Sequence, residues 1–95
     1  MSMTSEQTLR AAFTAVETNE SFSEAVLRFG DGSRLCFCHR VDERWAKAVG
    51  PEEREQESGL AGELLAAIVK FRLNAKHLDI EFKDGSRWDQ AHDLQ

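Results

Sequence analysis

Apolar residues recur at helical spacing in two parts of the chain. The first stripe consists of Leu9, Ala12, Phe13 and Val16. Thr4 and Gln7 have the spacing of a capping box at its start, so the pattern predicts a helix from Thr4 to Glu17. The second stripe consists of Leu60, Leu64, Ile68 and Phe71, widened by Leu65 and Val69. It predicts a more deeply buried helix over 60–73, ending at Asn74.

Two hairpins are predicted after these helices, over 22–41 and 77–90. The first turns at Gly30-Asp-Gly-Ser33 and the second at Asp84-Gly85. Asp-Gly is typical of a two-residue type I′ turn, in which both central residues have positive φ. Between the two units, Asp42 is placed to cap a short helix over 43–49 that carries Trp45. Gly50-Pro51 then begins an acidic connector that reads as a solvated helix start.

The two hairpins resemble each other. Leu27-Arg-Phe-Gly-Asp-Gly-Ser-Arg-Leu35 aligns with Ile80-Glu-Phe-Lys-Asp-Gly-Ser-Arg-Trp88 at an offset of 53 residues, which also places Val16 on Val69. This favours an internal αββ duplication, with convergence of two Asp-Gly turns as the alternative. The expected fold is α+β, a two-layer sandwich in the order α-β-β-(short α)-α-β-β. A four-stranded antiparallel sheet carries two helices on one face. One domain spans 1–95, with a first unit over 1–41, a connector over 42–58 and a second unit over 59–92.

A two-residue turn fixes which side chains share a face of the sheet. It places a core face under the helices, made of Leu27, Phe29, Leu78, Ile80 and Phe82. The opposite face then carries an apolar patch beside Arg28, made of Val26, Leu35, Phe37 and Trp88. Because a solvated sheet face should be polar, this patch predicts a contact surface.

Three interpretations of the patch remain open. It binds another protein or a second copy of the chain, it is covered by Trp45 within the monomer, or it stacks single-stranded nucleic acid through Phe37, Trp88 and Arg28. The net charge of −5 disfavours nucleic acid, since such domains are usually basic. Most of the excess acid lies in the connector and the second half of the chain. The candidate partner-binding residues are Val26, Arg28, Leu35, Phe37, Trp45 and Trp88.

Metal and catalytic chemistry are weakly indicated. Cys36 and Cys38 alternate with Phe37, so both would lie on the face opposite His39, and no second cysteine pair completes a zinc site. His77 could face His92 with Asp79 nearby, a known metal arrangement, but two cross-strand histidines on a solvated surface are the favoured interpretation. No nucleophile elbow or phosphate loop is present, which argues against an enzyme and predicts no cofactor.

The compartment follows from the cysteines and the apolar runs. With 95 residues, two closely spaced cysteines and no long apolar segment, the chain predicts a cytoplasmic protein that does not enter membranes. The expected function is a small protein–protein interaction or homodimerisation module. Single-stranded nucleic-acid binding and a small enzyme without a recognisable motif are the alternatives.

Overall fold

Two helices, each running directly into a strand, organise the computed structural model, which describes residues 2–51, 59–74 and 77–90. The elements are α1 (Ser5–Ala12), β1 (Phe13–Thr18), β2 (Glu24–Phe29), β3 (Arg34–His39), β4 (Arg44–Val49), α2 (Gly59–Ala67), β5 (Ile68–Leu73), β6 (Leu78–Phe82) and β7 (Arg87–Asp89). The strands form sheet A, with the order β1-β2-β3-β4, and sheet B, with the order β5-β6-β7. All pairings are antiparallel, so the predicted α+β class is confirmed.

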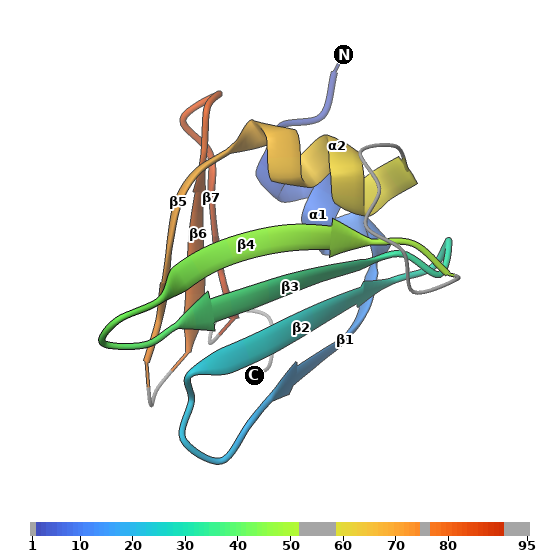
Figure 1. Ribbon diagram of the computed structural model, residues 1–95. Helices are drawn as coiled ribbons and strands as arrows, with labels where there is room; N and C mark the ends of the chain where they lie inside the picture. The colour runs from blue at the N-terminus through green and yellow to red at the C-terminus, as the bar shows by residue number, and fades with distance from the viewer. Residues whose placement is uncertain (1, 52–58, 75–76, 91–95) are drawn as a thin grey trace.

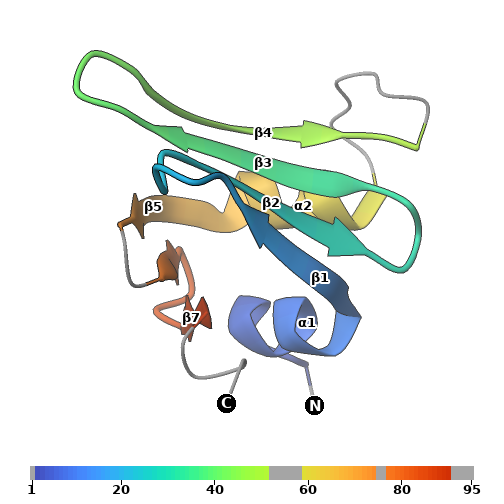
Figure 2. The same cartoon turned by 90° about the horizontal axis from the view of Figure 1, so that it is seen from below.

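Sheet A forms one layer of the molecule. Both helices and sheet B lie on the same side of it, as Figure 1 shows and as the view from below in Figure 2 makes clear. The other side of sheet A carries none of the described helices or strands. The shared core lies between the layers and contains Leu9, Leu27, Phe29, Leu35, Phe37, Leu64, Phe71, Leu78, Ile80, Phe82 and Trp88.

The prediction of a single four-stranded sheet is wrong. The C-terminal part of each predicted helix is a strand in the structure. The first helix ends at Ala12, and the second ends at Ala67. The residues that follow form β1 and β5, which pair with β2 and β6. Both segments are rich in β-branched or aromatic residues, which suits strands, and β5 alternates between exposed and buried side chains from Lys70 to Leu73. Each unit therefore has a further strand, and the strands divide between two sheets.

The predicted short helix over 43–49 is also wrong. This segment is β4, which pairs with β3 and lies at the edge of sheet A. The backbone N–H of Arg40 donates to the carbonyl of Glu43 at 2.6 Å, so Asp42 belongs to a tight β3–β4 turn and caps no helix. Ala46 and Ala48 face the core while Trp45 and Lys47 face outward, which is the period-two pattern of a strand.

The two Asp-Gly turns are longer by one residue than predicted. The N–H of Phe29 donates to the carbonyl of Ser33 at 3.0 Å, and Phe82 and Ser86 make the same bond at 3.0 Å. Gly32 has a φ of 88°, whereas Asp31 lacks the positive φ that a type I′ turn needs. These features define a three-residue loop with glycine in the left-handed position. The register shifts accordingly, and Leu27 pairs with Leu35.

The two units share backbone interactions beyond the turns. The last helical carbonyl of α1, at Ala12, accepts from the N–H of Gly30 at 3.2 Å, and Ala67 of α2 accepts from Lys83 at 2.8 Å. β1 and β5 each carry a register shift after their first residue. The hairpins align at the predicted offset of 53, but the helices and first strands align at 55, so Val16 corresponds to Phe71 and not to Val69. These matches support the predicted internal repeat.

Candidate functional surfaces

The predicted apolar patch does not exist as one open face. Leu35 and Trp88 are 0% exposed and Phe37 is 1% exposed, so all three belong to the core. The cause is the extra turn residue, because a shift of one residue moves a strand's side chains to the opposite face. With Phe37 and Trp88 buried, the predicted stacking platform for single-stranded nucleic acid loses both of its aromatic residues.

The remaining three candidate residues do share a surface. Val26, Arg28 and Trp45 lie on the side of sheet A that faces away from the core, and each is half-buried. We call this the outer face of sheet A, and its residues include Ala15, Glu17, Glu24, Val26, Arg28, Arg34, Cys36, Cys38, Trp45 and Lys47. Trp45 does not fold over it as part of a helix, since it lies within the sheet itself.

The internal repeat supplies a comparison for this face. The equivalent outer face of sheet B consists of Lys70, Arg72, Asp79, Glu81, Arg87 and Asp89. At three equivalent positions sheet A has an apolar side chain where sheet B has a charge. The pairs are Ala15 and Lys70, Val26 and Asp79, and Cys36 and Asp89. Sheet B thus has the fully polar face that a solvated sheet favours, whereas the outer face of sheet A mixes charged side chains with apolar ones.

Charged side chains border the apolar positions on the outer face of sheet A. Glu17 and Arg28 form an ion pair at 3.2 Å. The Nζ atom of Lys47 lies 4.8 Å from the centroid of the Trp45 ring, within the range of a cation–π contact. The indole N–H of Trp45 donates to Glu43 at 2.6 Å. Because these contacts hold the Trp45 ring, the face presents a defined aromatic surface.

The expectation that both cysteines face away from His39 is confirmed, but both lie on the outer face of sheet A and not on the face under the helices. In the register of β3, Cys36 pairs with Lys47 and Cys38 with Trp45 on the outer face, while His39 lies on the other side with Phe37. Both thiols are free. Burial raises the pKa of the Cys36 thiol, so it is a poor nucleophile at neutral pH.

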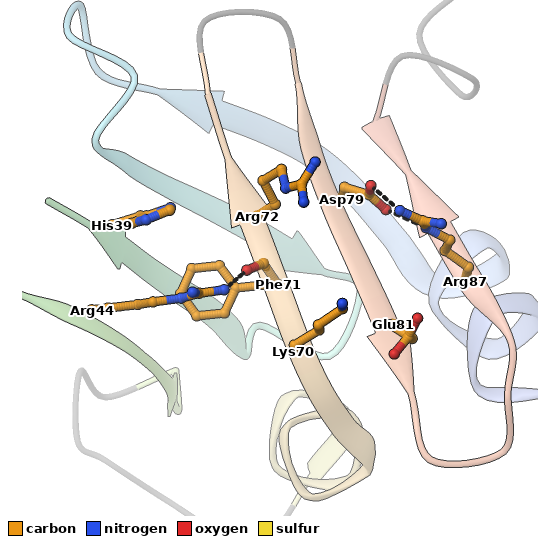
Figure 3. A pocket seen from close by; sticks show the side chains of 8 residues that line it. All are labelled: His39, Arg44, Lys70, Phe71, Arg72, Asp79, Glu81 and Arg87. Atoms are coloured by element: carbon orange, nitrogen blue, oxygen red, sulfur yellow. Dashed lines mark hydrogen bonds and ion pairs between the residues drawn. The ribbon is translucent and has the colours of Figure 1, made fainter.

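A second candidate site is a pocket on sheet B, where that sheet meets the ends of β3 and β4 (Figure 3). Its cavity is about 180 Å³. The lining residues are His39, Arg44, Lys70, Phe71, Arg72, Asp79, Glu81 and Arg87. Among these residues, only His39 and Asp79 figure in the interpretation of the sequence, each as part of a different metal-binding pattern. The sequence does contain a pattern that indicates a strand here, because polar and apolar residues alternate over Lys70-Phe-Arg-Leu73. The same residues also fit the end of the predicted helix, which was preferred.

One wall of this pocket is an ion pair. Arg87 Nε lies 2.9 Å from Asp79 Oδ1 and Arg87 Nη2 lies 2.6 Å from Oδ2, a two-pronged arrangement. The hydrogen bonds from Arg87 hold the pKa of Asp79 below its usual value, so this carboxylate is charged at neutral pH.

Asp79 also belongs to a possible metal-binding group with His77 and Asp89, whose ligand atoms lie within 4.8 Å of one another. Both oxygens of Asp79 already accept from Arg87, and His77 Nε2 lies 3.5 Å from Asp89. A cation here would have to displace the guanidinium of Arg87. The predicted partner of His77, His92, lies outside the described residues.

Comparison with known proteins adds no assignment, because no family model, curated protein or solved structure matches the chain. In the part of the chain that the structure describes, neither helix has the length and apolar character needed to cross a membrane.

Proposed function

We propose that this chain acts by binding, not by catalysis, and that its contact surface is the outer face of sheet A, used to form a homodimer. The proposal rests on a comparison of the two outer faces. At several positions sheet A has an apolar side chain where sheet B has a charged one. Ala15, Val26 and Cys36 replace Lys70, Asp79 and Asp89 on an otherwise equivalent face. Surface apolar groups gathered on one face are typical of a contact site.

The order of side chains across this face suits a second copy of the chain. Glu17, Val26, Cys36 and Lys47 are direct cross-strand neighbours, running from β1 to β4. A two-fold axis parallel to the strands would place Glu17 of one copy over Lys47 of the other, and Val26 over Cys36. An isologous interface needs such self-complementarity, with opposite charges at the two ends of an apolar row.

Arg28 and Arg34 limit the extent of this contact. They are cross-strand neighbours in the next row of the face, and the same axis brings them towards the arginines of the second copy. Arg28 is already paired with Glu17. We therefore centre the interface on Val26, Cys36 and Trp45 and place the two arginines at its solvated rim, where water screens their charge.

Sedimentation equilibrium tests the proposal directly. The wild-type chain should reach twice its mass of 10.7 kDa as its concentration rises. Val26→Asp should weaken the association at least tenfold, since it buries an unpaired charge. Val41→Asp is the matched control, because Val41 is fully exposed in the β3–β4 turn, away from the face. The proposal is overturned if the wild-type chain stays monomeric, or if Val26→Asp dimerises as strongly as wild type.

A charge exchange tests the predicted orientation. Glu17→Lys alone, or Lys47→Glu alone, should lower the association because each creates like charges across the two-fold axis. The double variant Glu17→Lys/Lys47→Glu should restore it. If the double variant loses as much dimerisation free energy as the two single variants together, the two residues do not meet across the axis.

We also infer a cytoplasmic location. Cys36 and Cys38 are free, and Cys38 is only 1% exposed. Two unpaired thiols, one of them in the sheet interior, are compatible with a reducing compartment. Fractionation of cells that express the tagged chain tests this inference.

A further inference from the structure

We propose that the pocket on sheet B is a binding site for a small amphipathic anion, a molecule with a phosphate or carboxylate group and a short apolar portion. This site is separate from the outer face of sheet A and does not depend on the proposed dimer. His39 and Arg44 reach it from the ends of β3 and β4, and Lys70 and Arg72 reach it from β5 (Figure 3).

The pocket concentrates positive charge in an acidic chain. Its lining has four cationic side chains and two carboxylates, although the whole chain has a net charge of −5. Asp79 is engaged by Arg87 through both oxygens, and Glu81 lies between Lys70 and Arg87 in the sheet register. Two positive charges therefore remain in excess within the lining, which favours an anionic ligand.

Lys70 and Arg72 are available to such a ligand. Both side chains are exposed at the pocket; Lys70 lies opposite Glu81 in the sheet register, and Arg72 lies opposite Asp79, whose carboxylate is already bonded through both oxygens to Arg87. Arg44 is held in place, because its guanidinium donates to the carbonyl of Phe71 and lies 5.0 Å from the centroid of the Phe71 ring. A guanidinium has five N–H donors, so Arg44 retains donors for an oxyanion.

An unsatisfied polar atom lies in the same lining. Nδ1 of His39 is buried and has no hydrogen-bond partner within the described residues 2–51, 59–74 and 77–90. The ring itself packs edge-on against Phe71, with the centroids 6.3 Å apart. Leaving a buried polar atom without a partner is unfavourable, so folded proteins seldom do so away from sites with a function. Because this atom is buried, a ligand in the pocket can supply the missing hydrogen bond only if the imidazole ring turns towards the cavity.

An apolar groove of about 420 Å³ adjoins the pocket and shares Arg44, Lys70 and Phe71 with it. The remaining groove residues are Ala46, Leu65, Ile68 and Val69. Val69 is 56% exposed, so its side chain is accessible to a ligand in this groove. A ligand whose anionic group contacts Arg44, Lys70 and Arg72 would extend its apolar portion along this groove, covering Val69.

Two probes separate the roles of charge and apolar contact. Inorganic phosphate has the charge alone, and hexyl phosphate adds a short apolar chain. In calorimetric titrations the protein should bind hexyl phosphate at least tenfold more tightly than inorganic phosphate. Arg72→Gln should weaken hexyl phosphate binding at least tenfold. Val69→Asp should weaken it without affecting inorganic phosphate to the same extent.

Lys83→Gln is the matched control, because it removes one positive charge from the exposed β6–β7 turn outside the pocket. It should leave both affinities within twofold of wild type. Arg44→Gln is a weaker test, since Arg44 also contacts Phe71 and its loss can disturb the fold. Absence of saturable hexyl phosphate binding, equal affinity for the two probes, or equal losses in Arg72→Gln and Lys83→Gln would each overturn the proposal.

Discussion

The carboxylate of Asp84 accepts a hydrogen bond from the backbone N–H of Ser5, at 2.8 Å and across 79 residues of sequence. The next helical N–H, that of Glu6, donates to the hydroxyl of Ser86 at 3.1 Å. A helix begins with N–H groups that have no partner inside the helix, and here the β6–β7 turn supplies two acceptors. The turn of the second unit therefore caps the helix of the first.

The reverse relationship also exists. In α2 the N–H of Leu60 donates to Asp31 at 3.1 Å, and the N–H of Ala61 donates to the hydroxyl of Ser33 at 3.2 Å. Each unit thus completes the hydrogen bonding of the other, and neither helix is fully capped by its own unit alone. This reciprocity explains why the Asp-Gly-Ser sequence occurs in both turns.

Ser33→Ala should destabilise the fold by about 1–3 kcal/mol, because it leaves a buried N–H without an acceptor. Ser33 is 1% exposed, and its hydroxyl both accepts from Ala61 and donates to Asp31. Ser86→Ala is the matched change at the equivalent, more exposed position, and it should cost less. Urea unfolding measures both. If Ser33→Ala and Ser86→Ala lower the free energy of unfolding equally, burial of the serine does not determine the size of the effect.

Acid should weaken the fold through the capping carboxylates. Hydrogen bonds from Ser86 and Ser5 lower the pKa of Asp84 from 3.8 to about 2. A group whose pKa is lower in the folded state stabilises that state fully above its unfolded pKa. This contribution is lost as the pH falls from about 4 towards about 2. Asp31 is shifted in the same direction, chiefly by the hydroxyl of Ser33.

Asp84→Asn tests this assignment. The variant should be less stable than wild type at about pH 6, and the difference should shrink at about pH 3, where Asp84 binds a proton in the unfolded chain, with a pKa of 3.8, and stays ionised in the folded one. Urea midpoints at the two pH values measure the effect. A difference between the proteins that is independent of pH would assign the acid sensitivity to other groups.

The turns show how far the sequence predicts this fold. The hairpins, their positions and the α+β class follow from the Asp-Gly signals and the apolar pattern. The turn type does not, because Asp-Gly suits both two-residue and three-residue loops. The deciding residue is the serine that follows. Asp31 accepts from both the N–H and the hydroxyl of Ser33, at 2.9 and 2.5 Å, which draws Ser33 into the turn. One extra residue then reverses the face of β3 and buries Phe37.

The helix ends show a different limit. Ile68 and Phe71 fit a helical stripe and also fit an alternating strand, so short apolar periodicity does not distinguish the two. Pairing with β6 decides the outcome, because the backbone of Ile68–Leu73 finds its hydrogen-bond partners there. This tertiary preference also creates the sheet B pocket, which has no counterpart in the predicted helix.

Thiol labelling provides a probe of the outer face of sheet A. Cys36 is half-buried and Cys38 is buried, and burial raises the pKa of the Cys36 thiol. In the folded monomer Cys36 should therefore react slowly with a disulfide reagent at neutral pH, and Cys38 should react only on unfolding. If the proposed dimer forms, Cys36 labelling should slow further as protein concentration rises. A Cys36→Ser variant that keeps a fast-reacting thiol would contradict the burial of Cys38.

The two tryptophans provide a direct test of the strand register. Trp88 is 0% exposed and contacts Phe13 edge-to-face, with the ring centroids 5.6 Å apart, while Trp45 lies on the outer face of sheet A. In Trp45→Phe the remaining Trp88 should emit at short wavelength and resist acrylamide quenching. In Trp88→Phe the remaining Trp45 should be quenched more readily than Trp88 at concentrations where the chain is monomeric, and less readily where the proposed dimer forms. Trp88→Ala should cost about 3–5 kcal/mol, as expected for a buried aromatic residue, and Trp45→Ala much less. A readily quenched Trp88 would instead require the two-residue turn, in which Trp88 faces away from the helices.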